Sequence, residues 1–428
     1  MDDNSPPESI DNSSTEKKKK SRRPANTAFR QQRLKAWQPI LTPKTVIPLF
    51  FVIGIICAPV GGLLIYASST VKELRIDYTN CFRDAPTDKA DLMGSDLVFP
   101  SFKENNTVNA QWQRTDNTNW TYGTYTVTNL TRCTLTFTLP EEMSAPVLFY
   151  YRLENFYQNH RRYVASFYDK QLLGDDVSVS DVKSSSCSPL DVESGSNPTW
   201  AYYPCGLIAN SVFNDTFSLP LLLNVPSTGG DQGTLQNLTY VMKNTSIAWE
   251  SDKALYGPRQ STNYDNIRPP PNWQIRYPDG KYSAEHPPPN LKEDEAFIVW
   301  MRTAGLPTFS KLYARNDTAP MQAGIYQIDI IDNFRTDVYQ GKKSIVLTTL
   351  SVMGGKNNFL GILWLVVGGF CIALALLFLV SNLIKPRKLG DHTYLSWNNV
   401  PASTDAKGKG KAASAGPSTG MATGRDLS

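Results

Sequence analysis

Two long stretches without a charged side chain constrain this chain more than any other feature. Residues 46–67 and 359–381 are almost entirely apolar, and as helices they would be about 33 and 34 Å long, slightly more than the roughly 30 Å hydrocarbon core of a bilayer. A cleaved signal peptide fits the first stretch poorly, because the apolar run is too long and 45 largely polar residues precede it. We therefore predict two transmembrane α-helices, at residues 46–67 and 359–384.

The charges beside these stretches predict the topology. Ten Lys or Arg residues and no acidic residue lie between Lys17 and Lys44, and Lys385, Arg387 and Lys388 follow the second stretch. Basic flanks remain in the cytoplasm, so both termini should be cytosolic and the intervening region exoplasmic. The expected organisation is a cytosolic segment at 1–45, a span at 46–67, an exoplasmic domain at 68–358, a span at 359–384 and a cytosolic tail at 385–428.

Cysteines and glycosylation sequons agree with an exported central region. Cys57 and Cys371 lie in the spans, whereas four further cysteines lie between the spans: Cys81, Cys133, Cys187 and Cys205. An even number in an oxidising compartment predicts two disulfides, for which three connectivities are possible. Seven N-x-S/T sequons also lie between the spans and predict N-glycans there: Asn105, Asn119, Asn129, Asn214, Asn237, Asn244 and Asn316.

Alternating apolar residues in the central region predict a β-rich domain. In residues 132–139 the side chains of Cys133, Leu135, Phe137 and Leu139 alternate with polar ones, which is typical of a half-buried strand. Further strands are expected at 146–152, 296–302, 324–331 and 344–352, and a helix at 154–167, where aromatic residues recur at helical spacing. We predict an antiparallel β-sandwich with helical and long-loop insertions.

The central region lacks the motifs of common enzymes. It contains no GxSxG, HExxH or CxxC, and no phosphate-binding GxxxxGK[ST] loop or Asp-Lys-Thr-Gly stretch occurs in the chain. We expect no catalytic residue, no cofactor and no metal. The net charge of +4 comes largely from the cytosolic ends, so it does not predict a nucleic-acid partner.

Several blocks of sequence resemble the cell-division-control-fifty, or ligand-effect-modulator, family, the accessory subunits of type IV P-type ATPase phospholipid flippases. The resemblance runs from about residue 28 to 388 and rests on six blocks: Phe29-Arg-Gln-Gln-Arg-Leu-Lys-Ala-Trp-Gln-Pro, Tyr151-Arg-Leu-Glu-Asn-Phe-Tyr-Gln-Asn-His-Arg-Arg-Tyr, Pro204-Cys-Gly-Leu-Ile-Ala-Asn-Ser, Phe213-Asn-Asp-Thr-Phe, Phe297-Ile-Val-Trp-Met-Arg-Thr-Ala-Gly-Leu-Pro and Gly354-Gly-Lys-Asn-Asn-Phe-Leu-Gly.

The resemblance implies a non-catalytic subunit that forms a 1:1 heterodimer with the ATPase. Such a subunit aids folding and exit from the endoplasmic reticulum, to the Golgi, endosome or plasma membrane, and supports transport of phospholipid from the exoplasmic to the cytoplasmic leaflet. The family pattern also implies the disulfides Cys81–Cys133 and Cys187–Cys205. Arg30, Arg33 and Trp37, in the first block, are expected to contact the ATPase.

Two other classes of protein share part of this pattern. A two-span ligand-gated channel subunit has the same topology, although channels of that plan tend to have more exterior disulfides. A membrane-anchored hydrolase would need a carboxylate or Ser/His constellation, and none is evident in the sequence. Membrane lipids and N-glycans are the remaining expected partners.

Overall fold

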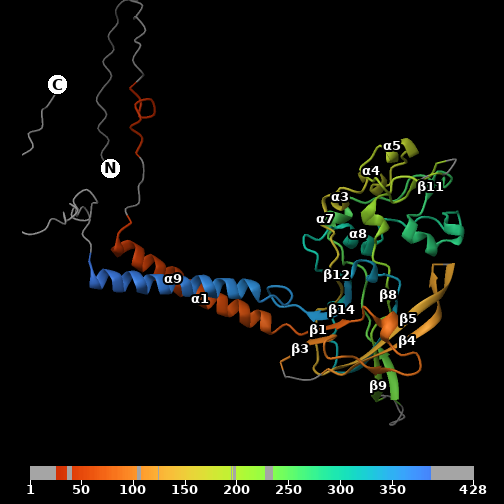
Figure 1. Cartoon of the computed structure of the whole chain (residues 1–428), viewed down its shortest axis with the longest axis horizontal. Coiled ribbons are helices and arrows are strands. Elements are labelled where there is room, and N and C mark those ends of the chain that lie inside the picture. The colour runs from red at the N-terminus through yellow and green to blue at the C-terminus, as the bar shows by residue number, and fades with distance from the viewer. Residues whose placement is uncertain are drawn as a thin grey trace, which may run out of the picture. The chain divides into compact units, whose positions relative to one another are not determined.

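The computed structural model describes residues 26–35, 41–103, 108–123, 125–193, 195, 199–226 and 235–386, and all structural statements concern these residues. They fall into two compact units, one within residues 1–54 and 370–428 and the other comprising residues 55–369. Figure 1 labels the helices and strands of the chain. Each unit contains one half of each of two long helices. These are α1 (Pro43–Ser69) and α9 (Phe359–Ile384).

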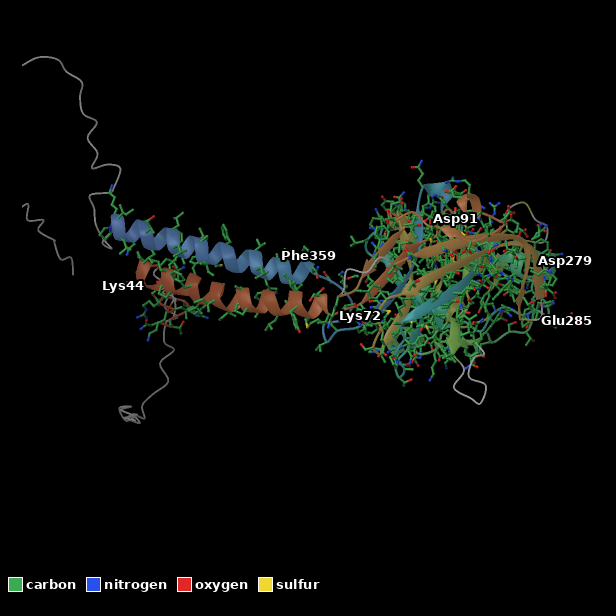
Figure 2. All side chains as sticks on the ribbon, turned by 90° about the horizontal axis from the view of Figure 1, so that it is seen from below. Lys44, Lys72, Asp91, Asp279, Glu285 and Phe359 are labelled. Atoms are coloured by element: carbon green, nitrogen blue, oxygen red, sulfur yellow. A yellow bond between two sulfur atoms is a disulfide. The ribbon has the colours of Figure 1, made fainter. Side chains whose placement is uncertain are left out.

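Both helices are long and apolar enough to cross a membrane, with 27 and 26 residues. In Figure 2 the side chains that project from them are almost entirely carbon. The first helix extends beyond the predicted span by three residues at its start and two at its end. Pro43 occupies the first helical position, where its missing N–H costs no hydrogen bond.

The region between the helices, here called the β domain (residues 70–358), is built on two antiparallel sheets. The five-stranded sheet has the order β12-β6-β14-β1-β3 and the larger one the order β10-β9-β13-β5-β4-β2, with β8 also paired to β13. Their strands are β1 (Glu73–Asp77), β2 (Asp91–Leu92), β3 (Val98–Ser101), β4 (Ala110–Tyr122), β5 (Tyr125–Leu139), β6 (Val147–Glu154), β8 (Thr216–Phe217), β9 (Leu221–Pro226), β10 (Leu235–Thr239), β12 (Phe309–Asn316), β13 (Gly324–Ile331) and β14 (Lys342–Thr349).

The two sheets enclose one hydrophobic core. Phe137 and Ile328 on the larger sheet and Phe149 and Leu347 on the smaller one are all buried in it. Phe217 of β8 contacts Phe149 edge to face, with ring centroids 5.1 Å apart. The alternation at 132–139 therefore has the predicted role, because every second side chain of β5 from Cys133 to Leu139 is buried in this core.

Short helices and a small third sheet are inserted between the strands. The helices are α2 (Cys81–Asp84), α3 (Arg161–Val164), α4 (Asp169–Leu172), α5 (Val179–Lys183), α6 (Leu207–Asn210), α7 (Glu250–Lys253), η1 (Pro271–Arg276), η2 (Pro278–Gly280), α8 (Glu295–Met301) and η3 (Asp337–Tyr339). The small sheet pairs β7 (Ala201–Tyr202) with β11 (Ile267–Arg268) in parallel.

The structure corrects two predicted elements. The strand expected at 296–302 is the helix α8, because Asp294 accepts a hydrogen bond from the backbone N–H of Phe297 and caps its start. The helix expected at 154–167 is only the single turn α3. Gln158 is fully buried and accepts a hydrogen bond from the N–H of Ala304, so this part of the chain follows tertiary contacts instead of a helical path.

The strands that connect to the two long helices are neighbours in the sheet. The first strand, β1, starts four residues after α1 ends and pairs with β14, with Leu74 opposite Leu347. Just outside this pair, the hydroxyl of Ser68 donates a hydrogen bond of 2.5 Å to the side-chain oxygen of Asn358. The sheet therefore brings the end of α1 and the start of α9 together.

Candidate functional site

The two long helices lie in close contact at a pair of glycines in the larger unit. A Cβ atom on Gly61 would lie 2.8 Å from the carbonyl oxygen of Gly361, and one on Gly361 would lie 2.6 Å from Ile65. Only glycine allows the two backbones this approach. At this point α1 and α9 of the same chain therefore pack directly against each other.

Gly54, Ala58 and Gly62 recur every four residues along α1, but they do not form one surface. Gly54 is buried, whereas Gly62 is exposed and has no atom within 4 Å of its Cβ position. Residues seven apart, such as 54 and 61, share a helix face, but each step of four turns the position by about 40°. Gly62 therefore lies outside the α1–α9 contact and is open to another helix.

The N-terminal basic segment (residues 26–35 in the structure) presents its side chains to solvent. Arg30 and Arg33 are exposed, and so is Phe29, at 77%. The N–H of Arg33 donates to the carbonyl of Ala28 at 2.7 Å, which closes a compact turn. Trp37, the third residue expected to contact a partner, lies outside the described residues.

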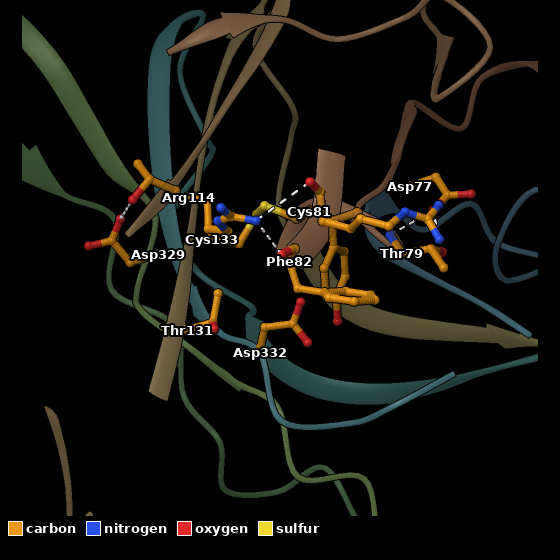
Figure 3. The surroundings of a disulfide bond; sticks show 12 residues. Asp77, Thr79, Cys81, Phe82, Arg114, Thr131, Cys133, Asp329 and Asp332 are labelled. Atoms are coloured by element: carbon orange, nitrogen blue, oxygen red, sulfur yellow. Dashed lines mark hydrogen bonds between the residues drawn. A yellow bond between two sulfur atoms is a disulfide. The ribbon is translucent and has the colours of Figure 1, made fainter. Parts of the chain in front are cut away.

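The four cysteines of the β domain form two disulfides, Cys81–Cys133 and Cys187–Cys205. These are the two pairs that the family resemblance implies. The first joins α2, which follows β1 of the smaller sheet, to β5 of the larger sheet. Figure 3 shows Arg114 beside this bond, where its guanidinium donates a hydrogen bond of 2.6 Å to the carbonyl of Phe82. The second closes a smaller apolar cluster around Val182 and Tyr202.

A buried cluster of charges lies near the first disulfide. The ammonium group of Lys343 is 2.8 Å from a carboxylate oxygen of Asp215 and 2.5 Å from one of Asp332, and it also donates to the carbonyl of Phe334. Tyr78 donates its hydroxyl hydrogen to Asp215 at 2.9 Å. The cluster therefore joins the end of β1, the segment before β8, the end of β13 and the start of β14.

Two carboxylates share one ammonium group in this cluster. Burial and the charge of Asp215 raise the pKa of Asp332 to about 6, although Lys343 acts in the opposite direction. The second oxygen of Asp332 has no hydrogen-bond partner. Burial by itself would lower the pKa of Lys343, but the two carboxylates outweigh it and the pKa is raised. The lysine is thus held as a cation between two acids.

This cluster is not predicted by the sequence analysis of the chain's motifs, because Tyr78, Asp215 and Lys343 lie far apart in the chain. Lys343 follows another lysine directly before the strand expected at 344–352, and neither Asp215 nor Asp332 stands at a recognisable spacing from it. The available signal was the block Phe213-Asn-Asp-Thr-Phe, which contributes Asp215 and two buried or half-buried aromatic residues.

The sequons differ in their exposure. Four of the described asparagines are exposed: Asn119, Asn129, Asn237 and Asn244. Asn214 is only half-buried, but its side-chain oxygen is buried without a hydrogen-bond partner, next to the charge cluster. The side chain of Asn316 is half-buried and donates to the carbonyl of Val241 at 2.9 Å. Asn105 lies outside the described residues.

Two membrane-length helices, joined by a large disulfide-bonded β-sandwich, define a two-span membrane protein. The family model described as "LEM3 (ligand-effect modulator 3) family / CDC50 family" matches residues 64–388. The chain belongs to this family.

Curated relatives match the chain along most of its length. It is 45% identical over 385 residues to the phospholipid-transporting ATPase accessory subunit CDC50 of Chaetomium thermophilum, which covers 89% of this chain and 92% of the relative. It is 39% identical to the accessory subunit LEM3 of Saccharomyces cerevisiae, over 89% of this chain and 88% of the relative. It is 37% identical to cell cycle control protein 50A of Mus musculus, over 85% and 90%.

Proposed function

We infer that this chain is a non-catalytic accessory subunit of a phospholipid-transporting P-type ATPase. The observation that carries the inference is the sequence identity of 45% and 39% to two relatives named as phospholipid-transporting ATPase accessory subunits. These matches cover nearly the whole of both chains. The alignment includes both spans and the β domain, so it is not limited to one shared module. The partner of the chain is accordingly the catalytic ATPase, and lipid transport is the process it serves. The comparisons give the channel alternative no support.

The topology we propose places both termini in the cytoplasm. The basic residues before α1 and after α9 favour it. So does the position of the seven sequons, all of which lie between the spans. The β domain then faces the exoplasmic side, where the two disulfides form.

Glycan mapping tests this orientation. We expect Asn119, Asn129, Asn237 and Asn244 to carry glycans, because their side chains are exposed, and Asn214 to remain bare. Single Asn→Gln variants at the first four positions should each remove one glycan from the mass of the protein. An unglycosylated chain, or glycosylation at Asn12 in the N-terminal segment, would contradict the orientation.

We further propose that the N-terminal basic segment contacts the cytosolic side of the ATPase. The exposed side chains of Phe29, Arg30 and Arg33 suit such a contact. Changing Arg30, Arg33 and Trp37 together to Ala should lower lipid transport while leaving glycosylation unchanged. If transport is unaltered, the segment serves only as a topological anchor.

Transport by the complex tests the function itself. The ATPase should be produced in cells with and without this chain, and the uptake of fluorescent phospholipid into the cytoplasmic leaflet measured. We expect uptake only when both chains are present, and we expect each chain alone to remain in the endoplasmic reticulum. Full uptake by the ATPase without this subunit would contradict the proposed function.

A further inference from the structure

The segment that connects β14 to α9 contains a tight turn with an apolar tip. Val352 is 102% exposed and Met353 60%, and Leu350, two residues earlier, is also exposed. Among the described residues, Val352 is the most exposed large hydrophobic side chain. Single exposed apolar residues are common on proteins, but two adjacent ones at the tip of a turn are a more specific feature.

Hydrogen bonds hold this turn in one shape. The N–H of Ser351 donates to the carbonyl of Gly354 at 2.8 Å, and the N–H of Gly354 donates back to the carbonyl of Ser351 at 2.9 Å. The hydroxyl of Ser351 accepts from the N–H of Met353 at 3.2 Å. Gly354 has a φ of +102°, which a residue with a side chain rarely adopts. The apolar tip is therefore part of a turn whose conformation is fixed by hydrogen bonds.

The turn is tethered close to the ends of both spans. The N–H of Asn357 donates to the hydroxyl of Ser68 at 3.0 Å, and that hydroxyl donates to Asn358. Ser68 is in the last turn of α1, and α9 begins at Phe359. Met353 stands four positions before Asn357 in the chain, which limits Met353 to about 14 Å from this point. Figure 2 shows Phe359 and Lys72 at these neighbouring helix ends.

The charge pattern of the segment matches the boundary of a bilayer. Residues 344–355 contain no charged side chain, and the first charge after the tip is Lys356. Both spanning helices are about 40 Å long, more than the roughly 30 Å of hydrocarbon, so their ends lie in the headgroup layer. Because the tip lies close to the helix ends, it should contact the lipid headgroup layer, whether or not another protein binds to the rest of the chain.

We propose that the turn Ser351–Gly354 inserts Val352 and Met353 into the exoplasmic leaflet of the membrane beside the second span. The lipid surface is the occupant because a short tether confines the tip to it, and because the exposed tip offers no charge to a polar partner. The turn would then fix the depth of the β domain at the membrane surface. The proposal rests on the membrane topology above and not on the identity of the ATPase.

Quenching of a probe on the tip tests the insertion. Val352→Cys is made in the full chain with Cys57 and Cys371 replaced by Ala, and the new thiol is labelled with an environment-sensitive fluorophore. The labelled complex with the ATPase, and the labelled chain alone, are placed in phosphatidylcholine nanodiscs that contain a lipid-borne quencher. We expect the lipid quencher to remove more than half of the fluorescence in both samples, and aqueous iodide to remove little.

Two further positions keep the result interpretable. Val338→Cys is a matched control, because Val338 is a valine of the same domain with 85% exposure that lies far along the chain from α9 and beside Asp337. Its probe should respond to iodide and not to the lipid quencher. Phe359→Cys reports on the span, and loss of lipid quenching there would mean that the topology, not the turn, is wrong.

Two results at Val352 would overturn the proposal while Phe359 still reports lipid. One is quenching by iodide as strong as at Val338. The other is protection from both quenchers that appears only with the ATPase, which would show that the tip is covered by protein. Because the side chain of Val352 is fully exposed, the substitution should not affect folding, and an unchanged thermal midpoint in detergent verifies this.

Discussion

The ammonium group of Lys343 lies 2.8 Å from the carboxylate of Asp215, at a position where the two side chains are 1% and 0% exposed. With Asp332 this pair joins the start of β14 to the segments next to β8 and β13 of the other sheet. A buried ion pair adds little stability compared with apolar packing, but removing one member leaves an uncompensated charge. The cluster therefore makes the β domain sensitive to single substitutions.

Changing Lys343 to Ala should destabilise the β domain by about 3–5 kcal/mol, because two carboxylates would remain buried without a cation. The matched control is Lys342→Ala, since Lys342 is the preceding residue and is exposed. Thermal unfolding and arrival at the cell surface measure the effect. Equal stability of the two variants would show that the cluster does not support the fold.

The contribution of Asp332 to stability should rise as the pH falls from 7.5 to 5. Asp332 has a pKa of about 6 in the folded chain, against about 4 when unfolded, so its contribution is complete below pH 4 and lost as the pH rises through 6. The shift corresponds to at most about 3 kcal/mol.

The variant Asp332→Asn isolates this effect, because other carboxylates titrate with the opposite sign. The pKa of Glu295, for example, is lowered by hydrogen bonds from three backbone N–H groups and from Lys253, which outweigh the effect of its burial. Thermal midpoints of both proteins should be compared between pH 7.5 and 5. We expect the difference between them to shrink at low pH. A difference that is constant with pH would exclude Asp332 as the titrating group.

Two adjacent glycines in α1 should respond differently to the same change. Gly61→Leu should prevent folding of the helix pair, because a Cβ at this position would already lie 2.8 Å from Gly361. Gly62→Leu should leave the isolated chain folded, since nothing lies within 4 Å, but should weaken binding if an ATPase helix packs there. Co-purification with the ATPase and glycan maturation separate the two effects. Normal binding by Gly62→Leu would place the partner on another face.

Loss of the first disulfide should be more damaging than loss of the second. Cys81 and Cys133 are separated by 52 residues and join α2 to β5, whereas Cys187 and Cys205 are separated by 18. The chain-entropy model gives about 4 and 3 kcal/mol for loops of these lengths, as upper values. Cys81→Ser should therefore reduce surface arrival more than Cys187→Ser, and the reverse order would contradict this account.

Much of the architecture was predictable from the sequence because its signals are local. The spans follow from length and the absence of charge, and the strand at 324–331 follows from its residue types and has the predicted bounds. The helix α8 could not be predicted from its own residues. Apart from the cap supplied by Asp294, its ends are stabilised by distant groups, including Lys311, whose ammonium donates to the carbonyl of Val299.

The charge cluster was unpredictable for a similar reason. Asp215 and Lys343 are 128 residues apart, and the two sheets must be paired before they meet. The different surroundings of Gly61, which contacts α9, and of Gly62, which does not, likewise depend on which side of α1 faces α9. The spacing of small residues in the sequence does not predict which side of α1 contacts α9. The two helices are brought together by the pairing of β1 with β14, which involves residues far apart in the chain.

Purification of the tagged chain from its native membrane in mild detergent tests the central claim most directly. We predict that one much larger chain, bearing the Asp-Lys-Thr-Gly phosphorylation motif of P-type ATPases, co-purifies in a 1:1 ratio. Mass spectrometry identifies that chain, and the native mass of the complex gives the ratio. Recovery of a homotrimer without such a chain would contradict the account and favour the channel class.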